Sequence, residues 1–134
     1  MPHILIIEDD EDLRPVLAGM LRAEGYTVSE EVEGAAGIDA ATEMPPDLLI
    51  TDIVMEGMEG IAAIMALRGI YPEMPIIAIS GNNLYLKSSA GLGADAILLK
   101  PFRREVLLQT VADLLHAGRR KSSDPDAWPS PLPA

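Results

Sequence analysis

The chain has 134 residues, 49% of them hydrophobic, no cysteine and a formal net charge of −11. This length and apolar content favour one folded domain, while the absence of cysteine excludes disulfide bonds and thiolate metal sites. The acidic charge argues against a nucleic-acid or membrane partner, since both need a basic face, and it favours a monomer or weak dimer that attracts cations.

The amino-terminal part of the sequence predicts a strand, a helix and a second strand. Residues 4–7 are a continuous apolar run, which is typical of a strand buried on both faces. Apolar residues then recur at helical spacing over 13–21, with Pro15 in the first turn, where its missing N–H costs little, and Gly25 as a carboxyl-terminal cap. Residues 26–29 follow as the second strand.

The same alternation continues to residue 118 and predicts strands at 48–51, 76–79 and 96–99 and helices at 34–43, 60–69 and 106–118. Before the last strand, residues 82–93 hold two glycines and two asparagines. We therefore expect a short or irregular helix there that is the least ordered part of the domain. The element order predicts an α/β fold, a doubly wound five-stranded parallel sheet with five flanking helices and right-handed crossovers.

Residues 119–134 differ in composition, with four prolines, small polar residues and no periodicity. We expect a folded domain at 1–118 followed by a disordered, proline-rich tail at 119–134. The sequence shows no signal peptide and no apolar run of the ~20 residues that a membrane span needs. We therefore expect a cytoplasmic location and no membrane partner.

Polar residues stand directly after four of the predicted strands. Glu8 and Asp9 follow the first strand, Asp52 the third, Ser80 the fourth and Lys100 the fifth. The carboxyl ends of parallel strands gather at one edge of the sheet, where ligands of open α/β sheets bind. We expect these side chains to surround a single point at that edge.

These residue types suit the transfer of a phosphoryl group. The carboxylate of Asp52 can attack phosphorus as a nucleophile and form an aspartyl phosphate. Neighbouring carboxylates repel one another unless a hard divalent cation, Mg²⁺ or Mn²⁺, binds between them, and such an ion would also neutralise phosphoryl oxygens. Lys100 offers a positive charge to one phosphoryl oxygen, and Ser80 offers a hydrogen bond to another. Asp10, in the same acidic run, is expected to be a helix cap or an outer residue of the site.

Four segments at these strand ends together resemble the receiver domain of response regulators in bacterial two-component signalling: residues 4–14, 47–55, 78–81 and 93–102. The resemblance covers residues 3–117 and is closest to receivers that stand alone as single domains. It implies a flavodoxin-like sheet with strand order 2-1-3-4-5. It also implies that Asp52 takes a phosphoryl group from a phosphohistidine of a sensor histidine kinase or a histidine phosphotransfer protein.

The resemblance further implies how the site is assembled. Asp9, Asp52 and the backbone carbonyl of Val54 would hold Mg²⁺, with Glu8 contributing through water. The peptide bond between Lys100 and the following proline would be cis.

The resemblance also assigns a switch. Ser80 would move to meet the phosphoryl group, and Lys100 would pair with it. The family's aromatic switch position, three residues before this lysine, is Ile97, so no ring can move inward when Ser80 moves. The loop after the acceptor carries Glu56 where the family usually has proline.

We therefore predict a phospho-acceptor of a phosphorelay rather than an enzyme, with slow autodephosphorylation. It would signal through contacts with an unknown downstream protein or through onward phosphotransfer. The alternative is a degenerate receiver that acts as a phosphorylation-independent interaction module, which Ile97 leaves open. A metal-dependent phosphohydrolase is disfavoured, because such enzymes need a second aspartate two residues after the nucleophile, where this chain has Val54.

Overall fold

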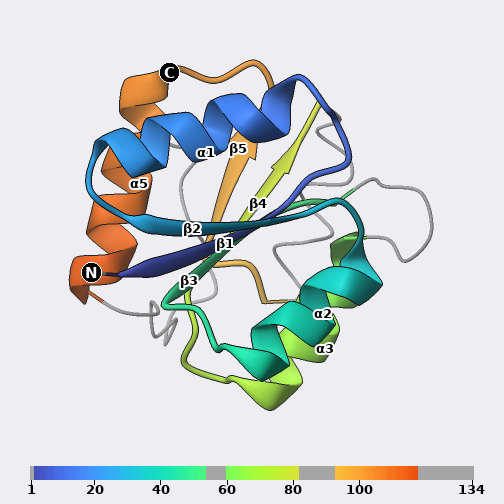
Figure 1. Cartoon of the computed structure of the whole chain (residues 1–134). Coiled ribbons are helices and arrows are strands. Elements are labelled where there is room, and N and C mark those ends of the chain that lie inside the picture. Colours follow the sequence, from blue (N-terminus) through green and yellow to red (C-terminus); the bar gives the residue numbers. More distant parts are fainter. Residues whose placement is uncertain (1, 54–59, 82–92, 118–134) are drawn as a thin grey trace.

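A computed structural model describes residues 2–53, 60–81 and 93–117 of the chain. Strands and helices alternate along these residues (Figure 1). Their bounds are β1 (His3–Ile7), α1 (Leu13–Ala23), β2 (Thr27–Glu31), α2 (Gly34–Glu43), β3 (Leu48–Asp52), α3 (Gly60–Ile70), β4 (Ile76–Ser80), β5 (Ala96–Leu99) and α5 (Arg104–Ala117).

The five strands form one parallel sheet in the order β2-β1-β3-β4-β5, as predicted. Helices α1 and α5 cover one face of the sheet, and α2 and α3 cover the other (Figure 1). Successive strand residues alternate between the two faces, so Ile4 and Ile6 pack with α1 and α5, whereas Leu5 and Ile7 pack with α2 and α3. Both faces are apolar for this reason, which explains the continuous apolar runs of the sequence.

The predicted elements agree with the structure except at some ends. Strand β2 begins at Thr27 and continues to Glu31, two residues beyond the predicted end. Its partly exposed edge position tolerates the two glutamates, and its length matches β1, with which it pairs from His3↔Thr27 to Ile7↔Glu31. Gly25 follows α1 with a φ of 95°, a left-handed conformation that glycine adopts without strain, as expected for a cap.

Two of the predicted segments fall outside the described residues. The irregular helix expected at 82–93 lies there except for its last residue, Gly93, and the tail expected at 119–134 lies there entirely. Among the described helices, none is both long enough and apolar enough to cross a membrane.

Candidate functional site

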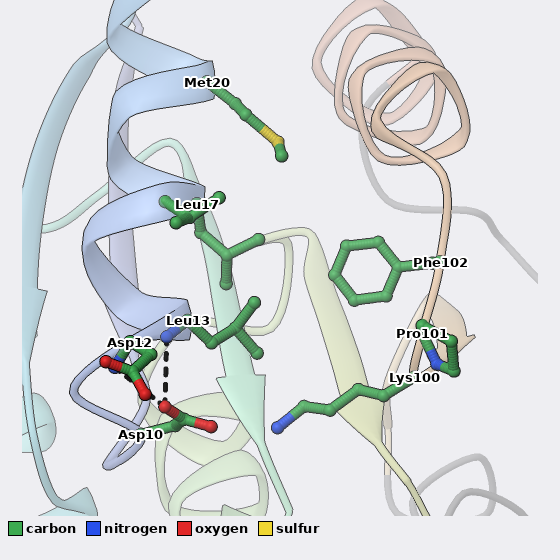
Figure 2. A pocket seen from close by; sticks show the side chains of 9 residues that line it. Asp10, Asp12, Leu13, Leu17, Met20, Lys100, Pro101 and Phe102 are labelled. Atoms are coloured by element: carbon green, nitrogen blue, oxygen red, sulfur yellow. Dashed lines mark hydrogen bonds between the residues drawn. The ribbon is translucent and has the colours of Figure 1, made fainter.

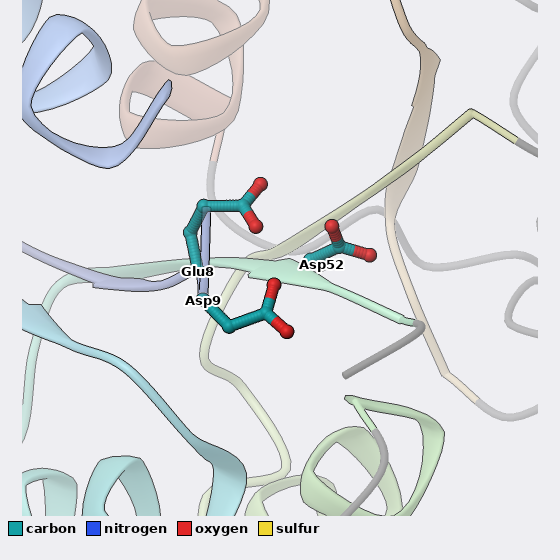
Figure 3. A group of neighbouring side chains, drawn as sticks. All are labelled: Glu8, Asp9 and Asp52. Atoms are coloured by element: carbon teal, nitrogen blue, oxygen red, sulfur yellow. The ribbon is translucent and has the colours of Figure 1, made fainter. Parts of the chain in front are cut away.

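The carboxyl ends of β1 and β3 bring three acidic side chains together. One carboxylate oxygen from each of Glu8, Asp9 and Asp52 lies within 4.8 Å of the other two. Figure 3 shows the carboxylates of Asp9 and Asp52 projecting into the same space from the two strand ends, with Glu8 beside them. Asp9 is exposed, whereas Glu8 and Asp52 are buried. The predicted convergence of these residues is present in the fold.

Lys100 joins this cluster from the end of β5. Its Nζ donates a hydrogen bond of 2.7 Å to Oδ2 of Asp52 and lies 2.8 Å from Oε1 of Glu8. Its backbone N–H donates to the carbonyl of Ser80, and the peptide bond between Lys100 and Pro101 is cis, as the resemblance implied. The ammonium group therefore bridges the carboxylates at two different strand ends.

Glu8 is the most deeply buried of the three carboxylates. Its side chain has no exposed surface, and its Oε2 accepts a 3.2 Å hydrogen bond from the backbone N–H of Asp10. Its Oε1 lies 2.8 Å from Nζ of Lys100 in an ion pair. Burial raises the pKa of Glu8 from 4.5 to about 7; Lys100 opposes this rise, and the charge of Asp52 adds to it.

Lys100 remains the cation of the cluster. Burial alone would lower its pKa, but the contacts with Asp52 and Glu8 outweigh this effect and leave the pKa raised. A protonated ammonium next to Asp52 is suited to receive an added phosphoryl charge.

The donor set fits a hard divalent cation. Among the described residues it consists of carboxylate oxygens, which Mg²⁺ prefers. The third expected ligand group, the backbone carbonyl of Val54, lies outside the described residues.

The segment between β1 and α1 is held by hydrogen bonds of its own. Oδ1 of Asp10 accepts from the backbone N–H groups of Leu13 and Asp12, at 3.0 and 2.8 Å, at the start of α1, where Asp12 is the N-cap residue. These two hydrogen bonds, that of Leu13 first, lower the pKa of Asp10.

Two residues near the site were not singled out from the sequence. A Cβ built on Gly60 would fall on the carbonyl oxygen of Asp52 and lie 2.5 Å from Cα of Ile53, so α3 can start beside Asp52 only with glycine there. Arg14 of α1 donates a 3.0 Å hydrogen bond to the carbonyl oxygen of Glu8. Neither role leaves a local signal in the sequence, because each depends on contacts between distant elements.

Ser80 and Ile97 occupy the expected elements. Ser80 ends β4 and is buried, with 2% of its surface exposed. Ile97 lies in β5, pairs with Ala78 and packs against the apolar cluster beneath α2 and α3. Its side chain is half-buried and aliphatic, so this position has no aromatic ring that could move when Ser80 moves.

A pocket of about 550 Å³ opens beside Lys100, between α1 and the segment after β5 (Figure 2). One wall is the apolar face of α1, and Pro101 and Phe102 form the opposite side. The residues that line it are Asp10, Asp12, Leu13, Val16, Leu17, Met20, Lys100, Pro101 and Phe102. Apolar surface is therefore open to a partner next to the carboxylate cluster.

Comparison with known proteins gives the family. Residues 4–112 match the family model described as the response regulator receiver domain. The transcriptional regulatory protein PrrA of Mycobacterium tuberculosis is 36% identical over 124 residues, which are 91% of this chain and 52% of PrrA. The transcriptional regulatory protein YkoG of Bacillus subtilis is 33% identical over 91% of this chain and 54% of its own length. The chain thus spans about half the length of these relatives.

Solved structures show the same fold. The chemotaxis response regulator CheY4 of Vibrio cholerae aligns with a TM-score of 0.78 and 27% identity over 85% of this chain and 98% of its own. The receiver domain of NtrX from Brucella abortus aligns with a TM-score of 0.81 and 28% identity over 84% of this chain and 98% of its own. Together with the matched residues, these likenesses show that the chain belongs to the response regulator receiver family.

Proposed function

We propose that the chain accepts a phosphoryl group on Asp52 from a phosphohistidine of a sensor histidine kinase or a histidine phosphotransfer protein. The observation that carries this proposal is the cluster itself. The ammonium of Lys100 lies 2.7 Å from Oδ2 of Asp52, and oxygens of Glu8 and Asp9 lie within 4.8 Å of an Asp52 oxygen. A nucleophile, a fixed cation and a cation-binding pair of carboxylates are what phosphoryl acceptance requires.

In the proposed reaction, an oxygen of Asp52 attacks phosphorus, the new P–O bond forms and the P–N bond to the donor's imidazole breaks. Lys100 stays beside Asp52 and stabilises the negative charge of the transferred group. The hydroxyl of Ser80 donates a hydrogen bond to another phosphoryl oxygen. Bound Mg²⁺, held by Asp9, Asp52 and the backbone carbonyl of Val54 with Glu8 contributing through water, would supply further neutralisation of the phosphoryl oxygens.

We further propose that the donor protein docks on the pocket between α1 and the segment after β5. The pocket shares Lys100 with the carboxylate cluster, and Asp10 at its lip belongs to the loop that carries Asp9. A phosphohistidine must approach Asp52 at this edge of the sheet, so a donor that covers the exposed apolar face of α1 brings its ring to the acceptor. Val16, with 51% of its surface exposed, lies on that face.

The output of the proposed phosphorylation is a contact with a downstream protein or onward phosphotransfer. Ile97, which packs against the apolar cluster beneath α2 and α3, supplies no aromatic ring to relay a movement of Ser80. The predicted absence of a nucleic-acid partner rests on the acidic charge of this chain alone. PrrA and YkoG are called transcriptional regulatory proteins, so the relatives do not support that absence for a longer protein.

The deciding experiment is phosphate incorporation from a small phosphodonor in the presence of Mg²⁺. We expect acid-stable, base-labile phosphate on the wild-type chain and none on Asp52→Asn, because the amide is not a nucleophile for phosphorus. Asp39→Asn, which changes an exposed aspartate of α2, is the matched control and should incorporate normally. If the wild-type chain takes no phosphate from small donors or from its cognate kinase, the degenerate receiver replaces this proposal.

A further inference from the structure

Arg14 connects helix α1 to the end of β1. Its Nη1 donates a 3.0 Å hydrogen bond to the carbonyl oxygen of Glu8, the first residue after the strand. Its Nη2 donates to Oε2 of Glu11 at 2.8 Å, and its Nε lies 3.6 Å from Oε1 of Glu30 on β2. The side chain is only 13% exposed, so the guanidinium group is held within this set of partners.

The hydrogen bond from Arg14 to the carbonyl oxygen of Glu8 fixes the peptide group between Glu8 and Asp9. The backbone N–H of Glu8 donates to the carbonyl of Glu31, so both backbone polar groups of Glu8 are held. Further along the loop, Oδ1 of Asp10 accepts from the N–H groups of Asp12 and Leu13, and the N–H of Arg14 donates to the carbonyl of Asp10. The loop between these anchors is Glu8-Asp9-Asp10, which carries two of the three clustered carboxylates.

We infer that Arg14 is a positioning residue for the cation site, holding the Glu8–Asp9 peptide so that both carboxylates face Asp52. The inference rests on the proposed function in so far as that function includes Mg²⁺ binding. A residue that orients metal ligands from behind contributes strongly to affinity, and loss of such a partner costs about tenfold or more in metal affinity. Arg14 is a cation near the site, so its charge should weaken Mg²⁺ binding by repulsion. Its hydrogen bond to Glu8 should strengthen Mg²⁺ binding by positioning the ligands.

Because the two effects are opposite, the direction in which Mg²⁺ affinity changes when Arg14 is replaced shows which effect dominates. If Arg14 acted only through its charge, its removal would strengthen Mg²⁺ binding by about twofold at ordinary ionic strength, because a nearby cation repels the metal. If it positions the loop, Arg14→Gln weakens Mg²⁺ binding by about tenfold despite that favourable change in charge. Arg14→Lys loses the planar fork that spans Glu8, Glu11 and Glu30 but can still donate a hydrogen bond to one of these partners. It therefore keeps part of the positioning, and its Mg²⁺ affinity should fall between those of the wild-type chain and Arg14→Gln.

Arg22 provides a matched control on the same helix. It also contacts Glu30, at 3.1 Å, and donates to a backbone carbonyl, that of Val28, at 3.0 Å. These contacts reach β2 and do not include residues 8–12. Arg22→Gln therefore removes the same charge and a similar hydrogen bond without touching the loop, and its Mg²⁺ affinity should remain within about twofold of wild type.

The experiment titrates Mg²⁺ into the wild-type chain and the three variants by calorimetry and measures amide hydrogen exchange over residues 9–12 in the metal-free proteins. We expect weaker Mg²⁺ binding and faster exchange in Arg14→Gln, and neither in Arg22→Gln. Thermal unfolding of each chain establishes that it is folded, and Arg14→Lys decides the question if Arg14→Gln does not fold. Unchanged or tighter Mg²⁺ binding in a folded Arg14 variant overturns the inference, as does a wild-type chain that binds no Mg²⁺.

Phosphate incorporation is measured in parallel on the same chains. Incorporation into the wild-type chain together with unchanged Mg²⁺ affinity in the Arg14 variants contradicts the role of Arg14 alone. Binding of Mg²⁺ without any incorporation contradicts the proposed function, and the order of Mg²⁺ affinities among the variants still decides the role of Arg14.

Discussion

Asp52, the proposed acceptor, is surrounded by residues that affect either its charge or its position. Lys100 contributes charge, with its ammonium shared between Asp52 and the buried Glu8. Gly60 contributes only by the side chain that it lacks, since its Cα lies against the backbone of Asp52. The hydroxyl of Thr51 donates a 2.9 Å hydrogen bond to the carbonyl of Asp52, the oxygen that a Cβ at residue 60 would meet.

Gly60→Ala should therefore displace Asp52 or the start of α3. We expect a loss of about 1–3 kcal/mol in the free energy of unfolding, typical of overpacking, and reduced phosphate incorporation at Asp52. Gly69→Ala in the same helix is the control, because a Cβ there meets no atom within 4 Å. It should gain about 0.5–1 kcal/mol through helix propensity. Urea unfolding measures both, and changes of the same sign in the two variants would contradict the steric argument.

The strands were predictable because each is buried on both faces and its apolar residues are contiguous. The same reasoning predicted that Asp52, Glu8 and Lys100 would meet, since parallel strands present their carboxyl ends at one edge. It did not predict that Lys100 pairs directly with Glu8, or that Arg14 reaches the carbonyl of Glu8. Those contacts depend on side-chain directions and on how α1 sits on the sheet, which periodicity alone does not determine.

At the scale of elements, α1 and the segment after β5 form the proposed docking pocket. Val16→Asp places a charge on the exposed apolar face of α1 and should reduce phosphotransfer from a protein donor by about tenfold, as expected for a residue central to an interface. Transfer from a small phosphodonor should stay unchanged, because Val16 does not contact the carboxylate cluster.

The matched control for the pocket is Met65→Asp, a similarly exposed apolar position on α3, with 55% of its surface exposed. It does not line the pocket, so transfer from both kinds of donor should be normal. Equal losses in the two variants, or a loss with the small donor as well, would show that the face of α1 has no special part in docking.

Across the whole molecule, charged side chains are arranged differently at the carboxyl ends and at the amino ends of the strands. The carboxyl edge gathers Glu8, Asp9 and Asp52 around Lys100. At the amino ends of the strands, Arg68 of α3 forms a 2.7 Å ion pair with Asp95, and their side chains are only 12% and 4% exposed. Asp95 also accepts from the backbone N–H of Ile76 at the start of β4, and Arg68 donates to the carbonyl of Gly93. This pair therefore joins α3, β4 and the segment before β5.

Arg68→Met keeps an unbranched side chain of similar length but takes the cation from a buried carboxylate. We expect a loss of about 3 kcal/mol in the free energy of unfolding, because Asp95 would stay buried without its ionic partner. The control Arg22→Met breaks a half-exposed pair with Glu30 and should lose less than about 1 kcal/mol. Denaturant unfolding measures the difference.

Mg²⁺ affinity and phosphate incorporation by the folded Arg68 variant should match wild type, since this pair lies at the amino ends of the strands, away from Asp52. A small loss of stability together with a large loss of incorporation would instead mean that Arg68 acts on the acceptor edge.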